Sequence, residues 1–459
     1  MSPDESATLT PSHVGSLPIL DRMRELNVPG VSAALVEHGD VVAQAAYGTK
    51  TAGDDAPVEE TTRFQACSIS KPVTSLGMLR LVEQGRLDLD ADVNDTLRAW
   101  RIPSNGAWSP RVTLRHLASH SAGLTAHGFP GYRRRATLPT LPQVLSGVSP
   151  ANTEGVRVDI VPGVQFRYSG GGTTVMQLLL EEVTGQPIAD LLRELVLEPL
   201  GMMHSSYEQP LPEALHDQAA TAHDPDGRPV PGGWHVYPEQ CAAGLWTTPG
   251  DLCRFAIGIQ RAVAGADGAV VSAATAETML SPQTPPSPSA ERIGGLNAVG
   301  IGPFLRSVDG HTTYFGHSGG NEGFRCHLLA HRDEGYAACV MTNSDAGVPL
   351  VIDAFDAIAT ARGWSGYTTE PLDALPPRGA ELDVFAGRFI SDAGLAVEID
   401  RSGSLLEVTI GDQRPAPFVA TDATTLASQV LDTTITVADG DLVLRQSGAE
   451  RTLRRVAGS

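Results

Sequence analysis

The sequence predicts an α+β domain followed by a small all-β barrel. Apolar runs with the spacing of strands stand near both ends of the first 370 residues, and helical patterns lie between them. The remaining residues change to short strands separated by turns. At 459 residues the chain also exceeds the usual size of one domain. We therefore expect a first domain over residues 1–370 and a second over residues 371–459.

The chain begins with a predicted helix and a β-hairpin. Residues 16–26 have the apolar spacing of a short amphipathic helix, and a Val-Pro-Gly sequence ends it. Two β-rich runs follow, over residues 31–39 and 41–48. A longer helix is predicted from Ser68 to Glu83, because apolar side chains recur every three residues and a proline falls in the first turn, where it is tolerated.

The middle of the chain is predicted to be helical and wrapped by loops. Residues 103–166 are rich in Gly, Pro, Ser and Thr, and we interpret them as long loops of the kind that shape binding sites. Helical patterns follow over residues 173–184, 187–201 and 248–263, and a flexible loop is expected over residues 281–292.

Four short apolar runs then predict an antiparallel meander, and a helix closes the first domain. The runs are residues 302–307, 312–319, 324–332 and 336–344, and the helix is 351–363. Strands from both ends of the domain should share one sheet. Beyond a linker at 371–377, eight short strands predict a small barrel or sandwich, which holds no histidine or lysine and so has a structural or substrate-shaping role.

The charge and composition exclude several classes of partner. The formal charge of −20 repels nucleic acid and anionic membranes, and Arg133-Arg134-Arg135 is the longest basic run. No window approaches the roughly 18 consecutive apolar residues of a membrane span. The polar, acidic N-terminus lacks the pattern of a secretory signal, so we expect a cytoplasmic protein that binds neither nucleic acid nor membrane.

The cysteines and histidines do not form a metal motif. Five widely spaced cysteines without a C-x-x-C pair predict reduced thiols. His116 and His120 stand four residues apart and could present two nitrogens to zinc. Because no H-E-x-x-H motif or suitably spaced carboxylate accompanies them, we expect no metal and no cofactor.

The scarcity of lysine singles out one residue. Of the 33 basic residues 31 are arginine, and the two lysines are Lys50 and Lys71. Arginine cannot lose its proton at accessible pH, whereas lysine can be tuned to act as a base. Lys71 stands three residues after Ser68 at the start of the predicted helix, so the two side chains share one face. This spacing places a nucleophile beside a base, near the amides and partial positive charge of a helix N-terminus.

Two further elements follow in chain order. Tyr168-Ser169-Gly170 comes after a Pro-Gly turn, and His317-Ser318-Gly319-Gly320 falls on a predicted strand. With Ser-x-x-Lys, this ordered trio resembles the penicillin-recognising serine enzymes, which include class C β-lactamases, D-aminopeptidases, carboxypeptidases and β-lactamase-like esterases. Four longer sequence segments also resemble that group: FQACSISKPVT, LASHSAGLT, AAGLWTTPGDL and GHSGGNEGF. The resemblance covers residues 16 to about 365, and the C-terminal strands resemble the lipocalin-like appendage of some relatives.

The resemblance implies a penicillin-binding-type fold and a role for each motif residue. Ser68 would attack a carbonyl, Lys71 and Tyr168 would move its proton, and His317 would orient or polarise. The amides of Ser68 and Gly320 would form the oxyanion hole. The positions that the motifs add as substrate contacts are Gly170, Ser318 and Gly319.

Two departures from the family pattern bear on the substrate. Gly170 stands where the lactamases have asparagine, so the contact of that asparagine with a substrate amide is missing. His317 replaces the lysine whose permanent charge meets a β-lactam carboxylate. Both changes favour esterase, amidase or transacylase activity over strong penicillin hydrolysis.

Each residue also has a structural interpretation. Ser68 could cap a helix, Tyr168 could be a core aromatic and His317 a strand histidine.

Cys67 adjoins Ser68, but successive helical residues point about 100° apart, so the thiol cannot face the same site. Gly316 to Gly320 also matches G-x-S-x-G, which would make Ser318 the nucleophile of an α/β-hydrolase. That fold needs an acid and then a histidine downstream, but only Glu322 precedes the two histidines that follow, His327 and His331, and no parallel βαβ pattern comes before the motif.

Together these observations predict a serine-dependent acyl-enzyme hydrolase that acts on a small ester, amide or peptide-like substrate. A transacylase of natural-product metabolism, which passes the acyl group to an amine or alcohol, is the alternative. A non-catalytic binding module is the second alternative, and it requires Ser68 or Lys71 to be dispensable.

Overall fold

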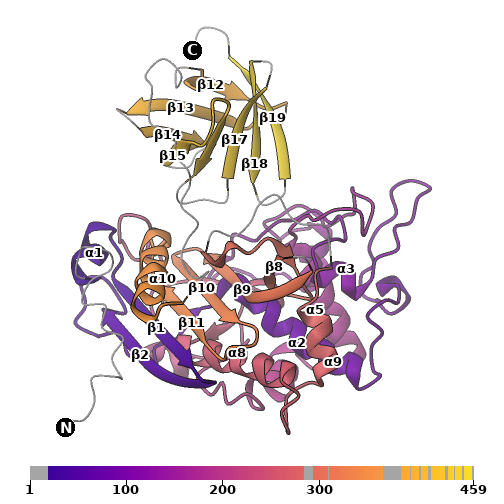
Figure 1. The fold of residues 1–459 in the computed structure, drawn as a ribbon. Helices are drawn as coiled ribbons and strands as arrows, with labels where there is room; N and C mark the ends of the chain where they lie inside the picture. The colour runs from indigo at the N-terminus through magenta and orange to yellow at the C-terminus, as the bar shows by residue number, and fades with distance from the viewer. Residues whose placement is uncertain are drawn as a thin grey trace, which may run out of the picture. The chain divides into compact units, whose positions relative to one another are not determined.

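The computed structural model describes residues 19–283, 293–308, 310–364 and 384–456, the last range with short gaps. The chain forms two compact units, one within residues 19–364 and one within residues 384–456 (Figure 1). Three predicted segments lie wholly or partly outside the described residues: the linker at 371–377, the start of the helix at 16–26 and most of the loop at 281–292.

A seven-stranded antiparallel sheet forms the centre of the first unit, in the order β2-β1-β11-β10-β9-β8-β7. Its strands are β1 (Gly30–Glu37), β2 (Asp40–Gly48), β7 (Ala298–Val299), β8 (Phe304–Val308), β9 (His311–Asn321), β10 (Phe324–His331) and β11 (Ala337–Thr342). The N-terminal hairpin pairs with the last strand of the meander through β1 and β11. The prediction that strands from both ends share one sheet is therefore confirmed.

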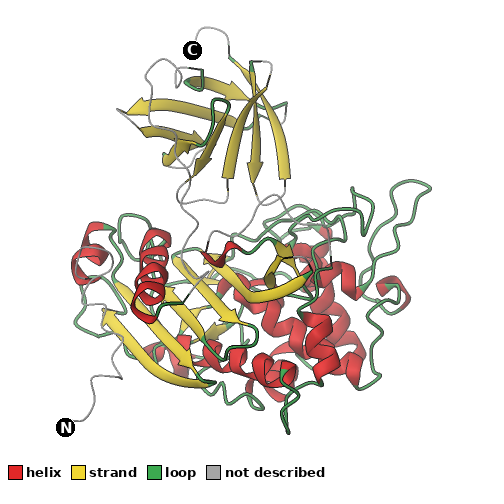
Figure 2. Cartoon of the chain, in the orientation of Figure 1, coloured by secondary structure: helices red, strands yellow, loops and turns green. Residues whose placement is uncertain are grey.

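Helices cover both faces of this sheet, as Figure 2 shows. The helices of the first unit are α1 (Ile19–Glu25), α2 (Ser70–Glu83), α3 (Leu114–Ala118), α4 (Leu141–Ser146), α5 (Gly170–Thr184), α6 (Ile188–Leu192), α7 (Gln240–Ala243), α8 (Pro249–Val263), α9 (Ala273–Met279) and α10 (Val348–Arg362). Apolar residues of α1 and α10 share a core with one face of the sheet. Those of α2, α5 and α8 form the core on the other face. Because both faces are buried, β1 is apolar along nearly its whole length.

Several helix boundaries differ from the predicted ones, and α10 begins at Val348 where residue 351 is predicted. The predicted helix from Ser68 is a 3₁₀ turn, η1 (Cys67–Ile69), followed by α2. Helix α5 begins at Gly170, earlier than predicted, because Ser169 Oγ accepts the Gly172 amide at 3.1 Å and caps it. The helix predicted over 187–201 is α6, which continues as a π-turn, η3 (Arg193–Leu197).

The loops between these helices carry two short strand pairs. Strand β3 (Phe64–Gln65) pairs with β6 (Trp246–Thr247), and β4 (Tyr132–Arg133) pairs with β5 (His235–Val236). No helix within the described ranges is long and apolar enough to cross a membrane.

The second unit is a closed eight-stranded antiparallel barrel, which confirms the predicted all-β domain. Its strands are β12 (Gly387–Ile390), β13 (Ala396–Ser402), β14 (Leu405–Ile410), β15 (Ala416–Ala420), β16 (Thr425–Ser428), β17 (Thr433–Ala438), β18 (Asp441–Gln446) and β19 (Ala449–Arg455). Phe385, Phe389 and Phe418 are buried in its core with aliphatic side chains from the strands. Side chains thus fill the interior, as in other small barrels.

Candidate active site

The segment that holds Ser68 lies between the sheet and the helical region. Ser68 is partly exposed in η1, whereas Cys67 and Ile69 on either side are fully buried. Cys67 has a φ of +52°, a conformation that few non-glycine residues adopt and that is often found at functional sites. The turn therefore buries the Cys67 thiol and leaves the Ser68 hydroxyl accessible, and it makes a cysteine nucleophile untenable.

Lys71 lies beside the Ser68 hydroxyl, as the three-residue spacing predicts. Lys71 Nζ is 2.9 Å from Ser68 Oγ and donates a second hydrogen bond of 2.8 Å to the carbonyl oxygen of Ala242, in α7. The side chain is only 4% exposed, and this burial lowers the pKa of Lys71 to about 7. A substantial fraction of the amine is therefore neutral near pH 7 and able to accept the serine proton.

Tyr168 joins Lys71 from the start of α5. Lys71 Nζ lies 4.9 Å from the centre of the tyrosine ring. The ring packs near two imidazoles, with centroid distances of 4.3 Å to His120 and 4.9 Å to His127. Phe304 stacks nearly parallel to it at 6.2 Å. The structure thus brings together the Ser-x-x-Lys and tyrosine motifs, which are about a hundred residues apart in the chain.

His317 also reaches this cluster, but as a neutral group. Its ring centroid is 6.0 Å from that of Tyr168, and the side chain is buried. Burial, together with the charge of Lys71, lowers the pKa of His317 to about 3. Its Nδ1 lies 2.5 Å from the Ser318 carbonyl oxygen, so the proton is on Nδ1 and Nε2 is left as an acceptor. His317 therefore provides no cation for a substrate carboxylate.

The backbone of β9 runs against the Ser68 segment. A Cβ at Gly319 would lie 2.7 Å from the carbonyl oxygen of Ala66 and 3.0 Å from Cys67 Cβ, so only glycine permits this approach. Strand β8 pairs with β9 no further than Gly316, which leaves residues 317–321 with a strand partner on one side only. Gly319, the residue before Gly320, therefore lies against the Ser68 segment at a part of β9 that β8 does not cover.

The other predicted contact residues differ in accessibility. Gly170 is buried at the start of α5, where an added Cβ would lie 3.0 Å from the Phe129 ring. Ser318 is exposed on β9, while its neighbours His317 and Gly319 are buried, because successive strand residues point to opposite faces. Ser318 also sits within an antiparallel strand and not at a strand-to-helix turn, so the geometry of an α/β-hydrolase nucleophile is absent there.

Sequence reasoning missed several residues around the site. Ala242 accepts the hydrogen bond from Lys71 with its backbone oxygen, and a backbone oxygen cannot be recognised from the type of residue. Asn321 donates to Gln65 Oε1 at 2.8 Å and to the Ala243 carbonyl oxygen at 3.0 Å, and so ties β9 to α7. His120 was considered only as a zinc ligand. The described residues contain no group of three His, Cys, Asp or Glu side chains that could hold a metal ion.

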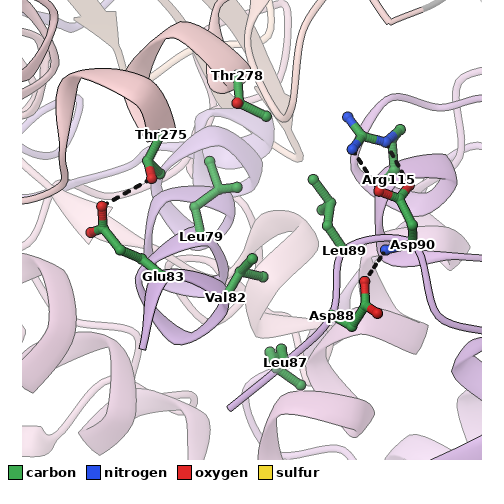
Figure 3. Close-up of a pocket in the computed structure, with 10 residues that line it drawn as sticks. All are labelled: Leu79, Val82, Glu83, Leu87, Asp88, Leu89, Asp90, Arg115, Thr275 and Thr278. Atoms are coloured by element: carbon green, nitrogen blue, oxygen red, sulfur yellow. Dashed lines mark hydrogen bonds and ion pairs between the residues drawn. The ribbon is translucent and has the colours of Figure 1, made fainter. Parts of the chain in front are cut away.

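A groove of about 520 Å³ lies elsewhere in the first unit (Figure 3). Its floor is apolar, from the end of α2 and the segment after it, and its rim includes Glu83, Asp90 and Arg115. Arg115 pairs with Asp90 through two hydrogen bonds of 2.7 Å, and Glu83 accepts from Thr275 at 3.0 Å. None of the candidate catalytic residues lines this groove.

The fold is that of a known family. The model of the Beta-lactamase family matches residues 19–362, which is most of the chain. The protein belongs to the beta-lactamase family.

Two similar proteins are named as an esterase and as a penicillin-binding protein. The chain is 30% identical to Esterase EstB of Burkholderia gladioli over 217 residues, which are 45% of this chain and 54% of EstB. It is 28% identical to Penicillin-binding protein 4 of Amycolatopsis lactamdurans over 391 residues, 81% of this chain and 95% of that protein. The chain thus spans only about half the length of the esterase that it matches.

A solved structure is similar in fold to nearly the whole chain. The octameric penicillin-binding protein homologue from Pyrococcus abyssi aligns with a TM-score of 0.65 and 23% identity, and the match covers 95% of this chain and 98% of that one. This likeness supports the fold of the chain.

Proposed function

We propose that this protein is a serine-dependent acyl-enzyme hydrolase that acts on a small ester, amide or peptide-like substrate. The observation that carries the proposal is the contact of 2.9 Å between Lys71 Nζ and Ser68 Oγ, with Lys71 buried and only partly protonated near neutral pH. A binding module would have no need for a buried lysine held in this state.

The geometry supports a specific sequence of proton transfers. Ser68 Oγ attacks the substrate carbonyl carbon while its proton passes to neutral Lys71 Nζ. The amides of Ser68 and Gly320 stabilise the oxyanion that develops. Tyr168, next to Lys71, gives its hydroxyl proton to the leaving group, whose bond to the carbonyl carbon then breaks, and takes up the proton held on Lys71 in return. Water attacks the acyl-enzyme in the second half of the reaction, and the same groups release Ser68.

The surroundings favour neutral acyl donors over β-lactams. His317 is uncharged, and Gly170 is buried against Phe129, so neither replaces the family's contacts to a carboxylate or a side-chain amide. Each missing hydrogen bond of this kind costs about 1–3 kcal/mol, which is roughly tenfold to a hundredfold in rate. We expect ready acylation by activated esters and weak turnover of nitrocefin.

Intact-mass spectrometry tests the proposal. Wild-type protein incubated with a panel of activated esters should gain one acyl group, located on Ser68 by peptide mapping. Ser68→Ala should show no adduct and no turnover, whereas the matched control Ser318→Ala should form the adduct and keep much of the turnover. Full activity of the Ser68 variant would refute the mechanism, and efficient nitrocefin turnover without esterase activity would make the protein a β-lactamase.

The second step decides between hydrolase and transacylase. Both reactions pass through the same acyl-enzyme, and water or an added amine or alcohol then competes for it. Amide formation that exceeds hydrolysis when amines are added would favour the transacylase.

A further inference from the structure

His120 lies directly beside the candidate catalytic tyrosine and has no role in the proposed mechanism. It follows α3 in a turn, with a φ of +55° and a side chain that is 2% exposed. We propose that His120 is a positioning residue that holds Tyr168 at the correct place for proton transfer. This inference rests on the function proposed above, because it assigns His120 to that reaction.

His120 contacts the segment around Tyr168 in three ways. Its carbonyl oxygen accepts the amide of Arg167 at 2.7 Å, on one side of Tyr168. Its Nδ1 accepts the amide of Ser169 at 3.2 Å, on the other side. Its ring packs against the tyrosine ring at a centroid distance of 4.3 Å. One residue therefore fixes the backbone before and after Tyr168 and also supports the ring.

The imidazole is suited to this role only in its neutral form. Because Nδ1 accepts a hydrogen bond from a backbone amide, its proton must be on Nε2. Burial and the neighbouring charge of Lys71 hold the pKa of His120 well below its ordinary value, so the acceptor on Nδ1 persists at neutral pH. A protonated ring would instead direct an N–H at the Ser169 amide.

The position of Tyr168 depends on this contact because His120 bonds both of the residues that flank it, Arg167 and Ser169. Tyr168 stands between an exposed loop and the first residue of α5, and Ser169 uses its hydroxyl to cap the helix. A shift of about 1 Å in a catalytic group is enough to slow a reaction by about a hundredfold. Loss of the Nδ1 acceptor should therefore reduce kcat without an equal effect on KM.

Two substitutions separate the parts of His120. His120→Phe keeps a ring against Tyr168 but removes the acceptor, and His120→Asn keeps an acceptor near Nδ1 but removes the ring. We expect His120→Phe to lower kcat by about tenfold to a hundredfold, and His120→Asn to recover part of the loss. His116→Asn is the matched control, since His116 is the neighbouring histidine and caps α3, and it should keep the wild-type kcat.

A double-mutant cycle with Tyr168→Phe identifies the route of the effect. If His120 acts through Tyr168, His120→Phe should lower kcat by less than about twofold in the Tyr168→Phe background. Equal losses in both backgrounds would overturn the inference, as would a wild-type kcat in either His120→Phe or Tyr168→Phe. If His120→Phe does not fold, as judged by circular dichroism, the same cycle is run with His120→Asn.

The Ser68 adduct distinguishes failure of this inference from failure of the proposed function. Absence of an acyl adduct on wild-type Ser68 would refute the proposed function itself. A normal Ser68 adduct together with unchanged kcat in the His120 variants would reject only the role of His120.

Discussion

Lys71 shows how one buried side chain sets the chemistry of its neighbour. An exposed lysine would be protonated at neutral pH and unable to accept a proton from serine. Here burial disfavours the charged form, while the contact with the Ala242 carbonyl oxygen holds the amine in place beside Ser68 Oγ. The hydrogen bonds orient the amine. Burial lowers its pKa to about 7, so that part of it is neutral near pH 7 and can accept a proton.

Replacement of Lys71 by arginine separates basicity from charge. Lys71→Arg keeps a positive charge but has no accessible neutral form, so it should reduce the acylation rate nearly as much as Lys71→Ala. The measurement is the rate of ester acylation by stopped-flow or quenched mass spectrometry. An arginine variant with a large share of the wild-type rate would show that Lys71 acts only through its charge.

The pH dependence of acylation should report the same group. Lys71 is active when neutral, so kcat/KM should rise with pH through a midpoint near 7 and level off above it. His317 stays neutral over this range because its pKa is about 3, so it should add no second transition to the pH profile of kcat/KM. The profile is measured with a neutral ester, so that the substrate itself does not titrate. A rate that is flat from pH 5 to pH 9 would contradict the role of Lys71.

At the scale of elements, the start of α5 shows why glycine is needed there. Three glycines open the helix, directly after Tyr168 and the cap residue Ser169. A Cβ at Gly171 would lie 2.8 Å from Val156 Cγ2 and 3.0 Å from the Thr125 carbonyl oxygen, whereas at Gly172 the nearest atom is 3.5 Å away. The first turn of α5 is therefore packed closely against the loop that also carries His127.

This difference predicts opposite effects for two alanine substitutions. Gly171→Ala should destabilise the protein by about 1–3 kcal/mol, because the buried Val156 and a backbone oxygen must move. Gly172→Ala should be neutral or stabilising by about 0.5–1 kcal/mol, since alanine is the better helix former. Urea unfolding of the two variants is the measurement. Equal stabilities would mean that the loop yields to the added methyl group.

At the scale of the whole molecule, the apolar cores of the two units are separate. The buried clusters of the first unit contain no residue of the barrel, and the barrel core contains no residue of the first unit. All candidate catalytic residues belong to the first unit. We propose that the domain boundary lies near residue 370, as the sequence predicts.

Truncation tests this proposal. The fragment of residues 1–374 keeps both cores of the first unit and should fold cooperatively and form the Ser68 adduct. Calorimetry and intact-mass spectrometry of the fragment and the full chain provide the comparison. An insoluble or unfolded fragment would show that the barrel is integral to the stability of the first unit. Altered ester selectivity in a folded fragment would support the substrate-shaping role.

The sequence alone determined the features that depend on local spacing or on chain order. Ser68 and Lys71 share a face because three residues make almost one helical turn, and this relation holds in any fold that forms the helix. The strands of the sheet and barrel follow from period-two patterns and turns, which act over a few residues. Those signals were sufficient for the fold class, whereas the family was indicated by the resemblance of the ordered motifs to the penicillin-recognising enzymes.

Only the tertiary structure decided the environment of those residues. The neutral state of His317, the carbonyl of Ala242 on Lys71 and the contact of His120 with Tyr168 all join segments far apart in the chain. Burial and ring packing arise from the way whole elements pack, and a backbone oxygen has no sequence signature. Packing therefore determined which of the residues in the sequence motifs are charged, which are neutral and which are held in place.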